Sequence, residues 1–481
     1  MTLLSRRSFL GGSVAAAGAA ALSPWARAAG ANQDVRLAVV GFRWRGKQLI
    51  EAFRKVPGVR IAALCDVDQE LLDQQRQECQ EHGERVEVYV DVRKLLDDEN
   101  IDAVAIATPN HWHALIGIWA CQANKDVYVE KPISHNIWEG AQLVAAARRY
   151  DRIVQTGTQN RSDMGLIQAM QYLHDGKLGR IKLARGLCYN RRKSIGKVTA
   201  AQPIPDHVDY NLWSGPAPIK PLLRKQFHYD WHWDQTYGNG DIGNQGVHEL
   251  DLCRWAIRAD ELPARVISAG GRFGYDDDGN TANTQIALFD YEPAPILFEV
   301  RGLPSRAGQQ EEVMDDYRKT RVGIVVECEK GYFAGGRGGG AVHEYDGKVI
   351  ERFQGDSGAG HQANFIEAVR NRDASSLRAE IREGYLSSAL GHMAGMSHQL
   401  GQHAGRDEIE RQLSVHPVAA DALARMAEHL QANEVDLAES PITLGAMLDW
   451  NDAEQKFNAD IETNRRLTRD YRQPFVVPKA V

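Results

Sequence analysis

Short apolar runs alternate with helical stretches over residues 35–155, and this alternation constrains the fold more than any other feature. The runs at 35–40, 59–65, 103–107, 127–129 and 153–155 have the length and apolar character of buried strands. Strands that alternate with helices specify a parallel sheet with right-handed crossovers. We therefore predict a doubly wound Rossmann domain that binds a dinucleotide, over residues 34–155.

The pattern changes after residue 157. Runs rich in β-forming residues at 180–188, 265–270, 283–290, 295–301 and 322–328 predict a second domain with an open, largely antiparallel sheet. The fold class is therefore α/β, with an N-terminal Rossmann doubly wound domain and a C-terminal α/β domain over 156–400. The glycine-rich stretch 331–360 predicts surface hairpin loops, because no Lys-Ser/Thr follows that would make a phosphate loop. Residues 401–481 predict a helical C-terminal extension.

The N-terminus has the order of a secretory signal. Arg6 and Arg7 precede Ser-Phe-Leu, an uncharged Ala/Gly-rich run follows over 11–22, and small residues stand at 26 and 28. This run is too short for a stable membrane anchor, and the paired arginines predict a twin-arginine (Tat) signal over 1–28. We therefore expect a periplasmic or other extracytoplasmic protein with no membrane association after the signal is removed.

Charge and cysteine spacing exclude several classes. The chain has 57 Lys and Arg against 64 Asp and Glu, so no basic excess exists to bind nucleic acid. Six cysteines stand far apart without a CxxC pair, which argues against a zinc site or a redox dithiol. His111 and His113 have no third ligand nearby in the sequence, so we expect no metal.

A glycine loop between the first strand and the first helix predicts the phosphate site. Of the usual G-x-G-x-x-G, Gly41 and Gly46 are present and Arg43 replaces the middle glycine. Asp66 ends the next strand, where an acid accepts hydrogen bonds from ribose hydroxyls and repels a 2′-phosphate, so NAD is favoured over NADP. Arg43 and Arg45 oppose this preference, since either can meet a phosphate. A Rossmann-like domain without a dinucleotide is the alternative.

Three further motifs complete a family pattern. Residues 107–113 read Ala-Thr-Pro-Asn-His-Trp-His, residues 130–132 read Glu-Lys-Pro, and residues 240–251 read Gly-Asp-Ile-Gly-Asn-Gln-Gly-Val-His-Glu-Leu-Asp. With the loop at Gly41, their order and spacing resemble the Gfo/Idh/MocA oxidoreductases over about residues 34–400. The resemblance implies hydride transfer between a carbinol carbon and nicotinamide C4 on a sugar, cyclitol or polyol. It also implies a homo-oligomer, a dimer or tetramer, formed through the open sheet.

The resemblance implies roles for individual residues. Lys131 contacts substrate and cofactor, and His248 is the acid/base. The family's Asp is Asn244 here, which can position a hydroxyl but cannot take its proton. We therefore assign catalysis to Lys131, His248 and Asn244. Asn244 and His248 are four residues apart, so on a helix both would face the cleft, with Asp251 placed to orient the imidazole.

The binding assignments follow from the same motifs. Cofactor binding is assigned to the loop, the strand ends and the motifs beside them: Gly41, Arg43, Trp44, Arg45, Gly46, Asp66, Thr108, Pro109, Asn110, His113, Glu130 and Lys131. Substrate binding is assigned to Asp251 and to the aromatic residues Trp233 and Tyr237, because sugar rings stack on aromatic faces. For the aromatic cluster, burial in a core or interface is an equal interpretation.

The sequence thus predicts an exported NAD-dependent oxidoreductase acting on a sugar, glycoside or polyol. Outside the cytoplasm there is no obvious pool of free NAD, so we expect the cofactor to be tightly bound. One alternative is a glycoside hydrolase that uses NAD transiently, through oxidation, elimination, hydration and reduction. A second alternative is a non-catalytic sugar- or nucleotide-binding protein.

Overall fold

The computed structural model describes residues 34–309, 313–413, 417–479 and 481. The predicted Tat signal over 1–28 lies outside these residues. Within the described part of the chain, no helix is long and apolar enough to cross a membrane.

The first sheet has six parallel strands in the order β3-β2-β1-β4-β5-β6. They are β1 (Val35–Val40), β2 (Val59–Cys65), β3 (Glu87–Tyr89), β4 (Ala103–Ile106), β5 (Asp126–Val129) and β6 (Val154–Thr156). The connecting helices are α2 (Arg45–Arg54), α3 (Gln69–Glu81), α4 (Val92–Leu96), α5 (Asn110–Gln122) and α6 (Ile137–Arg149). The doubly wound prediction is confirmed, and the strand order reverses between β1 and β4, where such sheets bind ligands.

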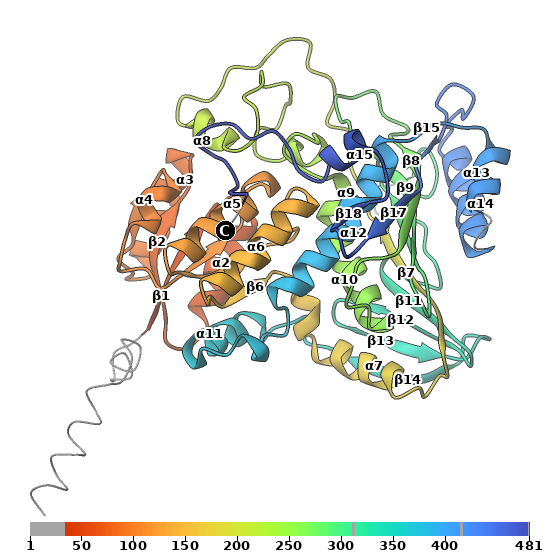
Figure 1. Cartoon of the computed structure of the whole chain (residues 1–481), viewed down its shortest axis with the longest axis horizontal. Helices are drawn as coiled ribbons and strands as arrows, with labels where there is room; N and C mark the ends of the chain where they lie inside the picture. Colours follow the sequence, from red (N-terminus) through yellow and green to blue (C-terminus); the bar gives the residue numbers. More distant parts are fainter. Residues whose placement is uncertain (1–33, 310–312, 414–416, 480) are drawn as a thin grey trace, which may run out of the picture.

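One helix of the first domain comes from far along the chain. Helix α11 (His361–Asn371) follows the strands of the second domain, yet Phe365 and Ile366 share a buried core with Leu37, Val39 and Phe53. Figure 1 shows α11 beside the first sheet. The chain therefore returns to the first domain after residue 360, a connection that the alternation over 35–155 does not reveal.

The second sheet has twelve strands and forms the other half of the molecule (Figure 1). Its main path is β14-β13-β12-β11-β7-β10-β9-β8-β16-β15, and β17 also pairs with β8. The strands are β7 (Ile181–Tyr189), β8 (Arg265–Gly271), β9 (Thr284–Asp290), β10 (Ile296–Arg301), β11 (Val322–Cys328), β12 (Tyr332–Gly336), β13 (Gly339–His343), β14 (Val349–Gln354), β15 (Gln402–His403), β16 (Thr443–Leu444), β17 (Leu448–Asn451) and β18 (Lys456–Phe457). Of the described pairs in this sheet only β7 with β10 is parallel, which confirms the largely antiparallel prediction.

Two expectations about this region were wrong. The glycine-rich stretch forms the paired strands β12, β13 and β14 rather than loops. Residues 401–481 are not simply helical, because β16 and β17 add to the edge of β8. An exposed strand edge carries unpaired backbone groups, and these additions satisfy them. Short helix α15 (Ile461–Arg465) follows.

Helices cover both faces of the second sheet. Helices α10 (Gly246–Ile257) and α12 (Ile381–Gln399) pack between the two sheets (Figure 1). On the opposite face, α13 (Arg406–Leu413) and α14 (Pro417–Ala432) bury Leu423 and Met426 against Ile286, Leu288 and Leu297. Part of the sheet expected to be open is therefore covered by the chain itself.

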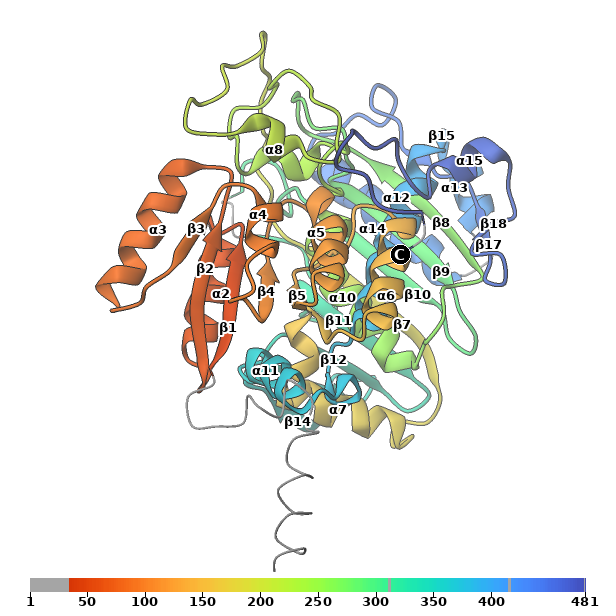
Figure 2. The ribbon, with the colours of Figure 1, turned by 60° about the vertical axis from the view of Figure 1, so that its left-hand side comes forward.

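A long segment between β7 and α9 (Gly240–Asn244) folds over one end of the first sheet, where α8 (Tyr210–Ser214) marks it in Figure 2. Asp68, 2% exposed at the start of α3, joins the two parts. Its carboxylate lies 2.8 Å from His207 Nδ1 and 2.8 Å from His228 Nε2. Two histidines of the segment are thus tied to the strand end that carries Asp66.

Candidate functional site

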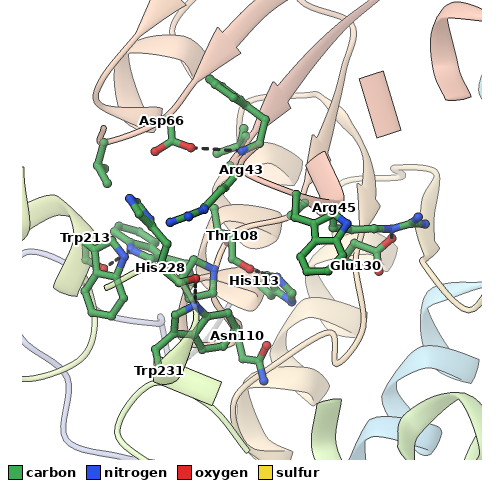
Figure 3. A pocket seen from close by; sticks show the side chains of 18 of the residues that line it. Arg43, Arg45, Asp66, Thr108, Asn110, His113, Glu130, Trp213, His228 and Trp231 are labelled. Atoms are coloured by element: carbon green, nitrogen blue, oxygen red, sulfur yellow. Dashed lines mark hydrogen bonds and ion pairs between the residues drawn. The ribbon is translucent and has the colours of Figure 1, made fainter. Parts of the chain in front are cut away.

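A cavity of about 540 Å³ lies at the carboxyl ends of β1, β2, β4 and β5 (Figure 3). Its walls come from both domains. The first domain contributes Gly41, Arg43, Trp44, Arg45, Asp66, Thr108, Pro109, Asn110, His113, Glu130 and Lys131, and the second contributes Trp213, His228, Tyr229, Trp231, His232 and Asn244. All but one of the residues assigned to the cofactor therefore line one cavity. The exception, Gly46, is buried beneath it.

The glycine loop is close-packed, which explains its two glycines. Gly41 has φ +76°, and a Cβ there would lie 2.9 Å from the backbone nitrogen of Thr108. A Cβ on Gly46 would lie 2.0 Å from the carbonyl oxygen of Gly41. Helix α2 begins after Trp44 without a side-chain cap, so its first backbone N–H groups are free to meet a phosphate. Arg43 points into the cavity (Figure 3).

Asp66 presents a carboxylate beside this loop. It accepts hydrogen bonds from the backbone nitrogens of Phe42, at 3.2 Å, and Asp68, at 3.1 Å. Burial raises its pKa to about 6. In the described part of the chain no Lys or Arg side chain pairs with Asp66, so its oxygens can accept hydroxyl hydrogen bonds.

Arg45, unlike Arg43, forms an ion pair with Glu130. Its Nε lies 2.7 Å from Oε1 of Glu130, whose side chain is 5% exposed. Burial disfavours the ionised carboxylate of Glu130, but the charges of Arg45 and Lys131 outweigh it and lower the pKa. Arg45 is thus neutralised by the Glu-Lys-Pro motif, which leaves Arg43 as the loop's cation toward a phosphate.

His113 positions two loops of the cavity. Its Nδ1 lies 2.6 Å from the carbonyl oxygen of Pro132, and its Nε2 lies 2.7 Å from that of Thr108. Pro109 caps α5, and Asn110 donates a hydrogen bond to Asn239 at 2.9 Å. These contacts hold the Glu-Lys-Pro motif against the end of β4.

The residues present fit NAD. The buried hydroxyl of Thr108 lines the cavity without a hydrogen-bond partner in the described chain, and Asp66 offers a free acceptor at the strand end. A glycine loop with an uncapped helix start and Arg43 suits a pyrophosphate, and an acid without a basic partner suits an unphosphorylated ribose.

Lys131 lies where the dinucleotide cavity meets the second domain. Its Nζ donates a hydrogen bond to the backbone carbonyl of Asn244 at 2.8 Å and approaches the side-chain oxygen of Asn244 at 3.4 Å. Burial lowers the pKa of Lys131, and the charge of Glu130 partly offsets this. The structure therefore brings two of the three assigned catalytic residues into contact.

His248 lines a second cavity, of about 960 Å³, rather than the first. Helix α9 ends at Asn244 and α10 begins at Gly246, although Gln245 between them keeps a helical backbone. Asn244 and His248 line different cavities, so they do not face one cleft as expected. The Nδ1 of His248 is buried without a partner among the described residues. Burial and then the charge of Lys131 hold its pKa well below the ordinary value. His248 is therefore neutral, and its Nδ1 has no partner in the described part of the chain.

The assignment of Asp251 was wrong. Its side chain is fully buried and accepts hydrogen bonds from Arg161 Nε at 3.0 and 2.9 Å and from Ser387 Oγ at 2.7 Å. These partners hold Asp251 on a face of α10 that lines neither cavity. Asp251 therefore neither orients the imidazole of His248 nor faces a substrate.

The structure does not place the two aromatic residues assigned to the substrate at a cavity. Trp233 is 3% exposed and Tyr237 is 1% exposed, and neither lines the two cavities. Residues 228–233 form the run His-Tyr-Asp-Trp-His-Trp, and His228, Tyr229, Trp231 and His232 of this run line the dinucleotide cavity. Figure 3 shows His228 and Trp231 there with Trp213. The run alone does not show which side chains turn inward.

Glu249 was missed by the sequence analysis. It is 3% exposed and lines the second cavity beside His248. Gln245 donates a hydrogen bond to its Oε1 at 3.1 Å, while its Oε2 has no partner in the described chain. Burial raises its pKa to about 8. Its position directly after His248 was the available signal.

Among the described residues, no cluster of three or more His, Cys, Asp or Glu could hold a metal ion. His111, which suggested one, is 1% exposed. Its ring nitrogens lie 3.0 Å from the carbonyl oxygen of Trp213 and 3.4 Å from that of Tyr237.

The fold and the first cavity define a dinucleotide-binding protein of two α/β domains. Residues 35–158 match the family of oxidoreductases with an NAD-binding Rossmann fold. Residues 181–286 match the C-terminal α/β domain of the same oxidoreductase family. The chain therefore carries the N-terminal NAD-binding domain and the C-terminal domain of the Gfo/Idh/MocA family.

Curated relatives include carbohydrate enzymes. Levoglucosan dehydrogenase of Pseudarthrobacter phenanthrenivorans is 27% identical over 38% of this chain and 42% of its own length. Myo-inositol 2-dehydrogenase of Thermotoga maritima is 24% identical over 79% of this chain and 98% of its own length. A glycosyl hydrolase family 109 protein of Shewanella is 31% identical over 32% of this chain and 39% of its own length. The chain thus spans less than half the length of two of these relatives.

A solved structure shows the same fold. It is the WlbA dehydrogenase from Bordetella pertussis in complex with NADH and UDP-GlcNAcA, with 20% identity and a TM-score of 0.55. The match covers 74% of this chain and 94% of that one.

Proposed function

We propose that this protein is an NAD-dependent oxidoreductase acting on a CH–OH group of a sugar, glycoside or polyol. The observation that carries the proposal is the hydrogen bond of Lys131 to Asn244, which places a lysine of the dinucleotide cavity beside the helix that presents His248. The names of the relatives, levoglucosan and myo-inositol dehydrogenases, support a carbohydrate or polyol substrate.

The side chains have distinct roles in this proposal. NAD, when bound, supplies a hydride acceptor. Lys131 donates a hydrogen bond to the reacting hydroxyl oxygen, and the carbonyl of Asn244 holds its ammonium group in place. His248 takes the hydroxyl proton on its imidazole, which its low pKa keeps neutral. Proton and hydride together leave the alcohol, which becomes a carbonyl.

We propose further that NAD stays bound through the catalytic cycle. The segment tied down by the Asp68 contacts to His207 and His228 covers the dinucleotide cavity, which supports slow release. Tight binding suits a protein exported by the Tat pathway to the periplasm, which we propose from Arg6 and Arg7. Homo-oligomerisation is proposed from the family resemblance alone.

The second candidate is an NAD-dependent glycoside hydrolase. The relative of glycosyl hydrolase family 109, at 31% identity, favours it. Lys131 and His248 would serve both reactions, because each begins by removing a proton from an alcohol. In the hydrolase, elimination of the leaving group and addition of water follow, and the hydride returns to the same sugar.

The test uses protein purified without added nucleotide. Denaturation should release one nicotinamide nucleotide per chain, and sugars, glycosides or polyols should change the reduced-nicotinamide absorbance of the native protein. Aglycone release without a net change in NADH assigns the hydrolase instead. Protein that binds sugars yet neither changes that absorbance nor releases aglycone is the non-catalytic binding protein, and the proposal is then wrong.

A further inference from the structure

The second cavity has a strongly one-sided charge. Its described lining contains five cationic side chains and one acid, Glu249. The cations are Arg318, Lys319, Arg321, Arg337 and Arg352. The first cavity is balanced, with three cations and three acids in its lining, and the whole chain has more acids than bases. The positive charge is therefore a local property of the second cavity.

Arg337 is one of the cations that line this cavity together with His248. It occupies the turn between β12 and β13, where Gly338 and Gly339 have φ +95° and +106°. A Cβ on Gly339 would lie 1.9 Å from the carbonyl oxygen of Phe353, so the turn requires glycine. Arg337 and His248 line the same cavity, and the charge of Arg337 is one of those that lower the pKa of His248.

The remaining cations lie before β11 and on β14, next to the glycine-rich strands β12 and β13. Arg318 lies over the ring of Tyr332, 4.1 Å from its centroid, and 3.9 Å from Glu327. Tyr332 pairs with His343 across β12 and β13, on the same face of the sheet as Arg352. The face that carries Tyr332 is the one turned away from α10. Because the cavity is lined both by His248 of α10 and by Arg352, it extends past the edge of the sheet formed by β12 and β13.

Most of this charge has no internal partner. Among the described residues, the side chains of Lys319, Arg321, Arg337 and Arg352 make no hydrogen bond or ion pair. Glu249 does not balance them, because its raised pKa of about 8 keeps it mostly protonated at neutral pH. Like charges gathered in one cleft attract an anion and raise its local concentration.

We propose that the second cavity binds the anionic group of a carbohydrate substrate, a carboxylate, phosphate or sulfate, and that Arg337 holds this group close to His248. The inference rests on the proposed function and deepens it by naming the substrate class. It also gives the glycine-rich stretch a role, since its glycines let the hairpin turn tightly enough to present Arg337.

The test is direct binding by calorimetry to the full NAD-loaded chain. Probes are matched sets: glucose, glucuronate, glucose 6-phosphate and glucose 6-sulfate, and galactose with galacturonate. Inorganic phosphate and sulfate show whether the anion alone suffices. At least one acidic sugar should bind about tenfold more tightly than its neutral counterpart, about 1.4 kcal/mol, and added salt should weaken only the acidic sugars.

The variant Arg337→Gln should lose this preference and leave the affinity for neutral sugars unchanged. Arg337 is exposed, so the variant should keep the unfolding temperature of the unaltered protein. The matched control is Lys348→Gln, an exposed cation of the next turn that pairs with Glu344 at 3.2 Å and does not line the cavity. It should behave as the unaltered protein.

Three results overturn the inference: no binding of any acidic sugar, equal affinity for acidic and neutral sugars, or a preference that survives Arg337→Gln. A changed oligomeric mass in Arg337→Gln with unchanged sugar binding would assign the cations to a contact between copies instead. If no acidic sugar is preferred while neutral sugars reduce the bound NAD of the unaltered protein, the proposed function stands without the anion site. Acidic sugars that bind through Arg337 but never alter the cofactor would leave the anion site standing without the function.

Discussion

Lys131 Nζ lies 2.8 Å from the backbone carbonyl oxygen of Asn244, and this hydrogen bond joins the end of the first sheet to helix α9 of the second domain. A backbone acceptor does not depend on the side chain at position 244. Asn244 therefore holds the lysine through its backbone, and in the proposed mechanism proton transfer falls to His248.

Replacing Lys131 or His248 by Ala should lower kcat by about 10²–10⁴ and leave one NAD bound per chain, because a positioned acid or base contributes that much. Steady-state kinetics and release of the nucleotide by denaturation check both parts. Near-normal turnover in either variant would remove that residue from the proposed chemistry.

Asn244→Ala should change kcat by less than about tenfold, since it removes only the 3.4 Å contact and keeps the 2.8 Å one. Kinetics of this variant beside Lys131→Ala provide the comparison. A loss as large as that of Lys131→Ala would show that the amide itself handles the substrate.

Asp66 should make NAD binding depend on pH. Its pKa is raised to about 6, so the ionised acceptor is present above pH 6 and lost as the pH falls below it. We expect the Kd of NAD to rise by about tenfold from pH 8 to pH 5. Asp66→Asn should show weak, pH-independent binding of NAD, measured by calorimetry after removal of the cofactor. Tighter binding of NADP than NAD by the unaltered protein would show that Arg43 dominates.

Asp251→Ala should destabilise the fold by about 1–3 kcal/mol, because it removes one of the two carboxylates that pair with the buried Arg161 and leaves only Glu383. Urea unfolding measures the loss, and KM at a temperature where the variant is folded should stay unchanged. A stable variant with a raised KM would restore Asp251 as a substrate ligand.

Changing Arg6 and Arg7 to Lys should stop export and leave the full-length protein in the cytoplasm. Fractionation of expressing cells, with a periplasmic marker as control, checks this. Normal export of the double variant would contradict the Tat assignment.

The first domain and its cofactor loop could be predicted because their signals are local. A short apolar run followed by a helical pattern is typical of a buried parallel strand. Gly41 and Gly46 are needed because neighbouring backbone atoms leave no room for a Cβ there. The role of Asp66 could be predicted for the same reason, since ligands of such sheets bind at the carboxyl ends of the strands, where Asp66 stands.

The second domain shows the limit of such signals. The edge strands β16 and β17 are too short to carry a pattern, and they exist because β8 has backbone groups to satisfy. Helix α11 has an ordinary amphipathic sequence, which does not tell which of two domains its apolar face will cover.

The amino-acid sequence by itself determined the two sheets, the dinucleotide loop and the neighbourhood of Lys131, Asn244 and His248, because periodicity and turn chemistry act over a few residues. Only the tertiary structure decided that Asn244 and His248 lie on separate helices and line separate cavities. It also decided that Asp251 is an ion-pair partner in the core. Which side a helical residue faces depends on what packs against each side of its helix, and those partners come from distant parts of the chain.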